Sequence, residues 1–149
     1  MLATKPSEIA AVCATIDPVS QGAGTVVSDY IDMGKFRKVM FILSVGALGA
    51  SATVDAVVKQ ATDSSGTGAK NLTTSLAITQ LTKAGSDDNK QVIVCVDAAM
   101  LDVNASFDHV ALSVTVATAA CLISVVGLGF DARWLPASDN DLSRVDEIV

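Results

Sequence analysis

The chain has 149 residues, of which 50% are hydrophobic and 17% charged, and 16 acidic against 10 basic residues give a formal net charge of −6. This length suits one domain with a sizeable core, and the apolar content excludes a disordered chain. The acidic excess argues against binding to the phosphates of DNA or RNA. A single histidine and 4% aromatic residues disfavour metal sites, general-base catalysis and stacking platforms, so we expect no enzyme activity, no cofactor and no metal.

Segments with the pattern of β-strands recur along the chain. Residues 38–45 are almost continuously apolar, which predicts a central strand covered on both faces. Residues 91–96 place valines on alternate positions, which predicts a strand with one buried face. Two further strands are expected inside the uncharged stretch 110–130, and the remaining ones are expected at 9–16, 25–30, 53–62 and 76–81.

Turn-forming residues separate these segments. Asp17 and Pro18 are expected to end the first strand, 63–68 to form a flexible polar loop and 85–89 a charged turn, with one helical turn at 97–101. About eight strands with almost no helix predict an all-β fold. The spacing favours an antiparallel β-sandwich, jelly-roll-like, with extended terminal arms.

The stretch 110–130 contains no charged residue and is long enough for a membrane helix. Its first half alternates apolar with small or polar residues, its β-branched content is high, and Thr118-Ala119-Ala120 suits a turn. No cluster of basic residues flanks it. We therefore expect a buried β-hairpin and no membrane partner.

The three cysteines, Cys13, Cys95 and Cys121, each lie in an apolar run, and none belongs to a C-x-x-C motif. Such cysteines are typically buried thiols in a reducing compartment. No apolar stretch typical of a signal peptide follows Met1–Ser7. These features predict assembly in a cytoplasm.

The composition changes after Phe130, and we divide the chain into a sandwich domain at 1–136, with an N-terminal arm at 1–8, and an acidic C-terminal arm at 137–149. Leu142, Val145 and Ile148 form a sparse apolar stripe on the second arm. Two interpretations stay open for it: a frayed terminus, or an arm that docks on a neighbouring subunit.

Individual residues give little sign of chemistry. His109 beside Asp108 lacks the motif of a hydrolase, and Asp87-Asp88-Asn89 lacks the spaced partner of a calcium loop and is expected to be a solvated turn. Trp134, the only tryptophan, suits a lid on the core or an interface anchor better than a platform for a sugar.

Several stretches together resemble a known group of proteins. They are Ser28–Phe36, Lys38–Ile42, Val45–Leu48, Ala52–Asp55, Ala77–Leu81 and Asn89–Val94. The pattern, over about residues 25–136, is similar to small structural proteins of tailed bacteriophages, a group that includes capsid decoration (cement) proteins with β-sandwich folds. The resemblance carries no catalytic residue.

The resemblance implies a structural protein of the virion that binds the outer surface of the major capsid protein lattice and stabilises the head. We expect a homo-oligomer on the capsid exterior, with a trimer favoured and a dimer possible. The alternative is a carbohydrate- or host-surface-binding module on a head protrusion or fibre. The expected interface residues are Leu2, Pro6, Phe36, Arg133, Trp134, Leu135, Leu142, Val145 and Ile148.

Overall fold

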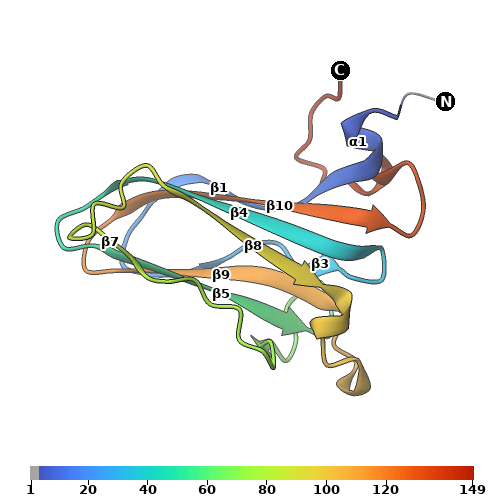
Figure 1. Ribbon diagram of the computed structural model, residues 1–149, viewed down its shortest axis with the longest axis horizontal. Coiled ribbons are helices and arrows are strands. Elements are labelled where there is room, and N and C mark those ends of the chain that lie inside the picture. The colour runs from blue at the N-terminus through green and yellow to red at the C-terminus, as the bar shows by residue number, and fades with distance from the viewer. Residues whose placement is uncertain (1–3) are drawn as a thin grey trace.

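The computed structural model describes residues 4–149, which form two antiparallel β-sheets packed face to face (Figure 1). The four-stranded sheet has the order β1-β10-β4-β8, and its strands are β1 (Ala10–Gln21), β10 (Cys121–Ala132), β4 (Phe36–Leu48) and β8 (Gln91–Asp97). The six-stranded sheet has the order β2-β9-β5-β6, with β3 also paired to β9 and β7 to β5. Its strands are β2 (Gly24–Val27), β3 (Ile31–Asp32), β9 (His109–Ala117), β5 (Thr53–Ala61), β6 (Lys70–Asn71) and β7 (Leu81–Thr82).

This strand order is that of a jelly roll. In the six-stranded sheet, β2 and β3 lie along the same edge of β9, and β6 and β7 lie along the same edge of β5. The strands therefore occupy eight positions, and the chain passes repeatedly from one sheet to the other, as in a pair of Greek keys. The expected all-β antiparallel sandwich is confirmed.

Four short helices complete the described chain: α1 (Pro6–Ile9) and the 3-10 helices η1 (Ala98–Met100), η2 (Val103–Ala105) and η3 (Ala137–Asn140). The helical turn expected at 97–101 is present as η1. Asp97 begins it, because its Oδ1 accepts a hydrogen bond of 2.9 Å from the backbone N–H of Ala99.

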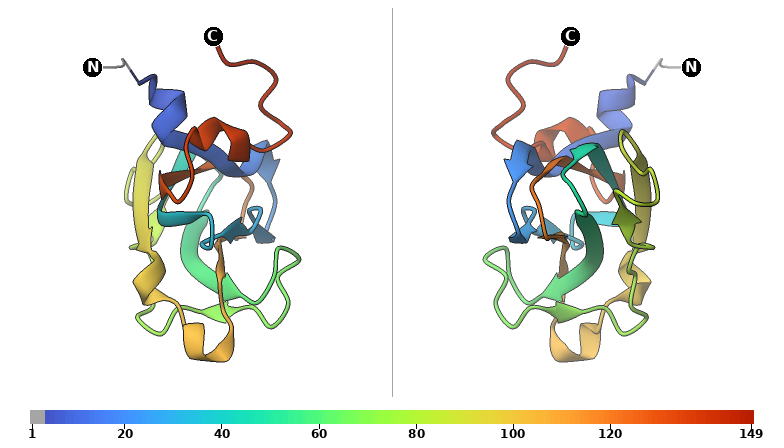
Figure 2. Two further views of the ribbon diagram at one scale, coloured as in Figure 1. Left: turned by 90° about the vertical axis from the view of Figure 1, so that its right-hand side faces the viewer. Right: turned by 90° about the vertical axis from the view of Figure 1, so that its left-hand side faces the viewer.

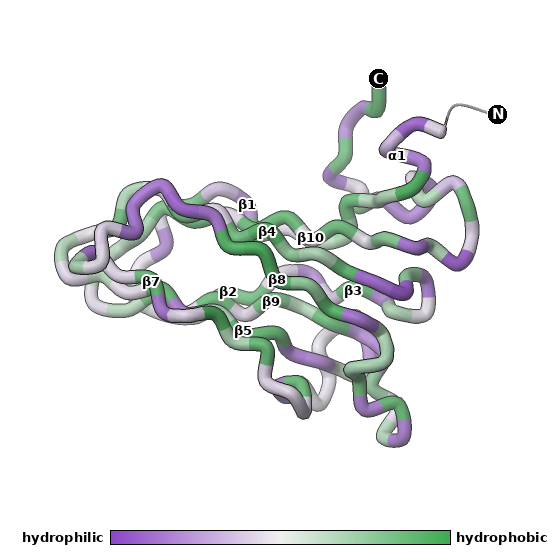
Figure 3. The backbone as a smooth tube through the Cα atoms, viewed as in Figure 1, coloured by the Kyte–Doolittle hydropathy of each residue, from purple (hydrophilic) through white to green (hydrophobic). Residues whose placement is uncertain are grey.

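The core lies between the two sheets, where hydrophobic residues dominate the strands (Figure 3). On β4, Phe41 and Leu43 point inward and are fully buried, as are Val58 of β5 and Leu112 of β9. Removing each such side chain from water contributes about 1.5–3 kcal/mol to the free energy of folding. The expectation that β4 is covered on both faces is wrong, because its outward residue Ile42 stays partly exposed.

The uncharged stretch forms two strands, as expected, yet they do not pair as a hairpin. β9 pairs with β5 and β2 in one sheet, and β10 pairs with β1 and β4 in the other. The turn at 118–120, in which Thr118 has a φ of 72°, carries the chain across the core. Within residues 4–149, no helix has the length and hydropathy needed to cross a bilayer.

Two other local expectations are corrected. β1 continues through Asp17 and Pro18, because a register shift between Ile16 and Val19 accommodates the proline on an edge strand. In place of the strand expected at 76–81, the structure has one bridge between Ala77 and Val57 and the short β7. The rest of this segment follows the edge of β5 as irregular backbone.

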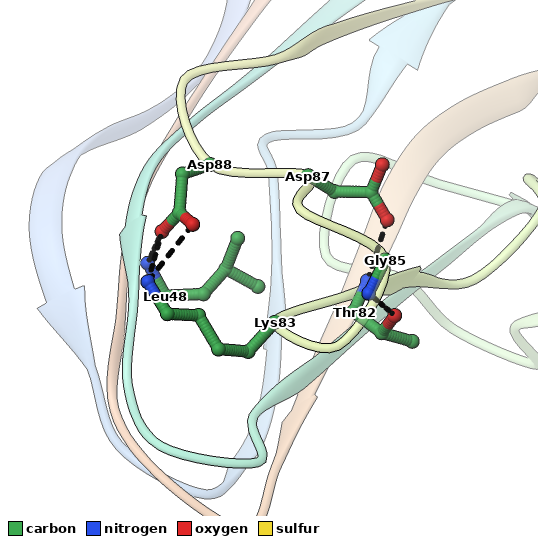
Figure 4. Close-up of polar contacts among 6 residues, drawn as sticks. All are labelled: Leu48, Thr82, Lys83, Gly85, Asp87 and Asp88. Carbon is green, nitrogen blue, oxygen red and sulfur yellow. Dashed lines mark hydrogen bonds and ion pairs between the residues drawn. The ribbon is translucent and has the colours of Figure 1, made fainter.

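The charged turn at 85–89 forms as expected, and its carboxylates are used locally (Figure 4). Asp87 accepts a hydrogen bond of 2.9 Å from the backbone N–H of Thr82. Asp88 accepts one of 2.8 Å from the backbone N–H of Leu48 and a second of 2.9 Å from Nζ of Lys83. The turn therefore holds the β7–β8 connection to the end of β4.

The C-terminal segment begins as part of the sandwich, past the expected boundary at 136. Ala137 is fully buried in the core, and η3 lies against β1. The backbone N–H of Val12 donates to Oδ1 of Asp141 at 2.7 Å, and that of Leu142 donates to the carbonyl of Val12 at 2.8 Å. The segment thus covers an otherwise open sheet edge.

Candidate functional site at the terminal end of the sandwich

Most of the expected interface residues lie at one end of the molecule. Figure 2 shows both chain ends leaving the sandwich at this end, with α1 beside η3. The segments that carry these residues are α1, which contacts η3 and β10, the connection from β10 to η3, and the chain that follows η3. The expected residues on these segments are Pro6, Arg133, Trp134, Leu135, Leu142, Val145 and Ile148. Leu2 lies outside the described residues.

Phe36 is not an interface residue, which corrects the sequence-based expectation. Its side chain is 1% exposed and its ring packs against Gly129 of the neighbouring strand β10. A Cβ added at Gly129 would lie 2.6 Å from that ring, so the glycine is needed to make room for the phenylalanine. Phe36 belongs to the core.

The N-terminal side of this end is the single helical turn α1. Pro6 occupies its first turn, where a missing backbone N–H costs nothing, and the backbone N–H of Lys5 donates to the Glu8 carboxylate at 2.7 Å. Ile9 at the end of the turn is 49% exposed. The turn therefore presents an apolar side chain next to the C-terminal segment.

The connection between β10 and η3 carries the largest exposed side chains. Trp134 is 69% exposed and Leu135 is 68% exposed; we call these two residues the terminal knob. The backbone N–H of Arg133 donates to the carbonyl of Lys35 at 2.9 Å, and the buried Ala137 follows the knob. The backbone is thus held on both sides while the knob points to solvent.

After the knob, the chain contacts β1 as far as Arg144, whose guanidinium pairs with the Asp17 carboxylate. This hydrogen-bonded contact raises the pKa of Arg144 further above its usual value. Beyond it, Ile148 and Val149 are exposed apolar residues. We call residues 145–149 the tail; of the expected C-terminal arm, this is the part that projects from the sandwich.

Sequence reasoning missed a second surface, the outward face of the four-stranded sheet. Strand register places Leu128, Met40 and Cys95 in one row across it, and Val126, Ile42 and Ile93 in the next. All six are partly or fully exposed, and we call them the outer apolar face. The signal was present in the sequence, because 38–45 lacks the polar alternation of a solvated strand.

At the terminal end of this face lies a shallow hollow of about 490 Å³. Its walls come from three neighbouring strands and from η1. Its lining is mainly apolar, and its two charged residues, Lys38 and Asp97, are partners across β4 and β8. The side chains that shape it are those of Lys38, Met40, Cys95, Asp97, Met100 and Phe130.

Side chains that could act as nucleophiles, bases or metal ligands do not assemble into a reactive centre among residues 4–149. No group of three or more His, Cys, Asp or Glu side chains there has the arrangement of a metal site. Burial raises the pKa of the Cys13 thiol to about 11, so this thiol stays protonated near neutral pH. His109 Nδ1 lies 2.5 Å from the neighbouring Asp108 carboxylate, and no serine or cysteine in the described part of the chain hydrogen-bonds to this pair.

Compared with models of known protein families and with curated proteins, the chain matches none.

Proposed function

We propose that the protein is a capsid decoration (cement) protein of a tailed bacteriophage. In this proposal it binds the outer surface of the major capsid protein lattice as a symmetric homo-oligomer, with a trimer favoured over a dimer, and it reinforces the head. It assembles in the host cytoplasm and remains on the exterior of the virion.

One observation carries this proposal: the two chain ends leave the same end of the sandwich, and both bear exposed apolar side chains that the fold itself does not need. Ile9 is 49% exposed and Ile148 is 47% exposed. A rigid body with two adjacent binding segments suits attachment to a repeating surface. There, many weak contacts combine through effective concentration.

The fold and the charge are compatible with this role. Jelly rolls are common among viral capsid and lectin domains, although a fold by itself does not determine a function. The formal net charge of −6 would also keep an external protein from adhering to nucleic acid. The resemblance of residues 25–136 to small structural proteins of tailed bacteriophages supports the same role.

The test is cosedimentation of the purified chain with empty capsid shells of the phage whose genome encodes it. We expect saturable binding and a higher temperature of shell disruption. A variant that ends at Arg144 should keep its melting temperature, because the tail makes few contacts, and should bind shells at least about tenfold more weakly.

The control is Val103→Ser, which alters an apolar residue that is 67% exposed on η2, on the opposite side of the sandwich from α1 and the tail (Figure 2). It should bind shells like the unaltered chain. Truncation at 136 is unsuitable, because it removes Ala137 from the core. Absence of binding by the full chain, or full binding by the chain ending at Arg144, would refute the proposed role of the tail.

The second candidate is a carbohydrate- or host-surface-binding module, and the exposed indole of Trp134 is the observation in its favour. Most other phenylalanine side chains cannot join it in a binding platform: Phe36 and Phe41 are buried, and Phe107 is 8% exposed beside Lys70. Phe130 is partly exposed, but it lines the hollow on the four-stranded sheet. Binding of the isolated chain to a glycan array that is lost in Trp134→Ala would favour this candidate over the first.

A further inference from the structure

We propose that the terminal knob of one copy of this chain inserts into the hollow on the four-stranded sheet of a second copy. The occupant of the hollow is thus Trp134 with Leu135 from an identical chain. This inference deepens the proposed function and rests on it, since it names the contact that holds the proposed homo-oligomer together.

The knob has the properties of an interface anchor. Trp134 and Leu135 are 69% and 68% exposed, so neither occupies the hollow of its own chain. The bond from Arg133 to Lys35 and the buried Ala137 hold the backbone on either side. Because the backbone is fixed already, little conformational entropy is lost when the knob is covered. Tryptophan is also among the residues most enriched in interface hot spots.

The hollow has the size and the surface to receive these two side chains. Its volume of about 490 Å³ lies within the range of about 300–1,000 Å³ that sites for small organic groups occupy. Met40, Met100 and Phe130 are among the residues that line it. The unbranched methionine side chains adapt readily to the shape of an aromatic ring.

The charges around the knob complement those around the hollow. Arg133 precedes the knob in the chain, while Asp97 and Lys38 are the charged residues that line the hollow. None of the three forms an ion pair within residues 4–149. An inserted knob brings Arg133 toward Asp97. Asp131, whose contact with Arg37 is exposed and 3.7 Å long, is then available to Lys38.

Both complementary surfaces belong to the same end of every copy. Phe130 in the wall of the hollow precedes Trp134 by four residues along β10 and the following turn. A copy can therefore insert its own knob and receive another at the same time. Reciprocal insertion closes a twofold dimer, and insertion in one rotational sense closes a threefold ring.

The first test measures the molar mass of the purified full chain by light scattering across a dilution series. We expect a dimer or trimer. The double variant Trp134→Ala with Leu135→Ala should associate at least about thirtyfold more weakly, the usual loss when a hot spot is truncated. Val103→Ala is the matched control, because it shortens a similarly exposed apolar residue outside the contact, and it should leave the mass unchanged.

The second test uses Cys95, which lines the hollow and is exposed, whereas Cys13 and Cys121 are buried. Alkylation of Cys95 by iodoacetamide reports whether the hollow is covered. At concentrations where the chain is associated, we expect the rate to be at least about tenfold lower than in the knob variant, since the covered thiol reacts only after dissociation.

The third test reverses the charges. Arg133→Glu and Asp97→Lys should each weaken association, and the two together should restore part of it, because the pair is re-formed with its signs exchanged. Melting temperatures identify any loss caused by removing the Asp97 cap of η1. If the losses of association in the two single variants simply add in the double variant, the pairing of Arg133 with Asp97 is contradicted.

The outcomes separate this contact from the proposed function. A monomeric full chain overturns the contact, as does an unchanged mass in the knob variant. Protection of Cys95 only on capsid shells assigns the hollow to the capsid instead and also overturns it. Oligomers that do not bind shells would refute the decoration role but not the contact. A monomer that binds shells would refute the contact but not the decoration role.

Discussion

The two faces of the four-stranded sheet are both apolar, yet only one of them is covered. On β4, Phe41 and Leu43 point inward and are fully buried against the second sheet. Their neighbours Met40 and Ile42 point outward and remain partly exposed. An antiparallel sheet that faced only water on its outer side would show polar residues there. We infer that one face of this sheet serves folding and that the other is suited to contact with another surface.

Truncating one residue on each face should give the largest difference in stability. Phe41→Ala should lower the free energy of unfolding by about 3–5 kcal/mol, because it leaves a cavity between the sheets. Ile42→Ala, the matched change on the outer face, should cost about 1 kcal/mol or less. Urea denaturation at a concentration where the chain is monomeric measures both. Equal losses would mean that the outer face is as well packed as the inner one.

A smaller effect is expected where the sheet has no room for a side chain. Gly129→Ala places a Cβ 2.6 Å from the Phe36 ring and should cost about 1–3 kcal/mol through overpacking. Gly22→Ala is its control, since no atom lies within 4 Å of the added Cβ, and thermal unfolding should hardly change. If Gly129→Ala leaves the free energy of unfolding unchanged, the Phe36 ring can shift to make room for the added methyl group.

The covered edge of the sheet should depend on Asp141. Asp141→Ala leaves the backbone N–H of Val12 without its 2.7 Å partner and should cost about 1–2 kcal/mol. Amide hydrogen exchange should then accelerate at Val12 and in η3. Asp139→Ala, which removes a neighbouring carboxylate without such a bond to β1, serves as the control and should leave that exchange unchanged.

A further expected effect concerns pH. Burial raises the pKa of Cys13 from 9.0 to about 11, so the unfolded chain loses this proton before the folded chain does. The contribution of the neutral thiol is therefore complete below pH 9 and declines as pH rises toward 11. Unfolding measured across this interval should show the decline, and Cys13→Ala should reduce it. An identical pH profile in that variant would exclude Cys13 as its source.

The sequence predicts the class of fold and most strand positions, because alternation and turn residues are local signals. It does not reveal that the two strands of 110–130 lie in different sheets, since the choice of partner strands depends on the whole chain. Pro18 predicts the end of a strand, although β1 continues through it. The register shift that accommodates the proline on an edge strand cannot be recognised from the local sequence. Phe36 has the size and apolar character of an interface residue, and only its place against Gly129 assigns it to the core.

The candidate site is predicted only in part. Trp134 and Leu135 stand out as large apolar residues next to a polar segment, and the structure exposes both. The hollow cannot be anticipated, because its walls come from three strands that are distant in the sequence. The first half of the acidic segment has the composition of a free arm, yet it is held against β1. The sequence does not reveal this, because the hydrogen bond from Val12 to Asp141 joins residues 129 positions apart.

The adjacent exit of the two chain ends has a practical consequence. A short linker could join Val149 to the N-terminal residues, and new ends could then be opened in the exposed loop at 63–68. Such a circular permutant would keep every strand pairing while closing the terminal end into a continuous loop. A foreign sequence fused to the new ends would then be carried by this loop, and neither α1 nor the tail would have to bear it.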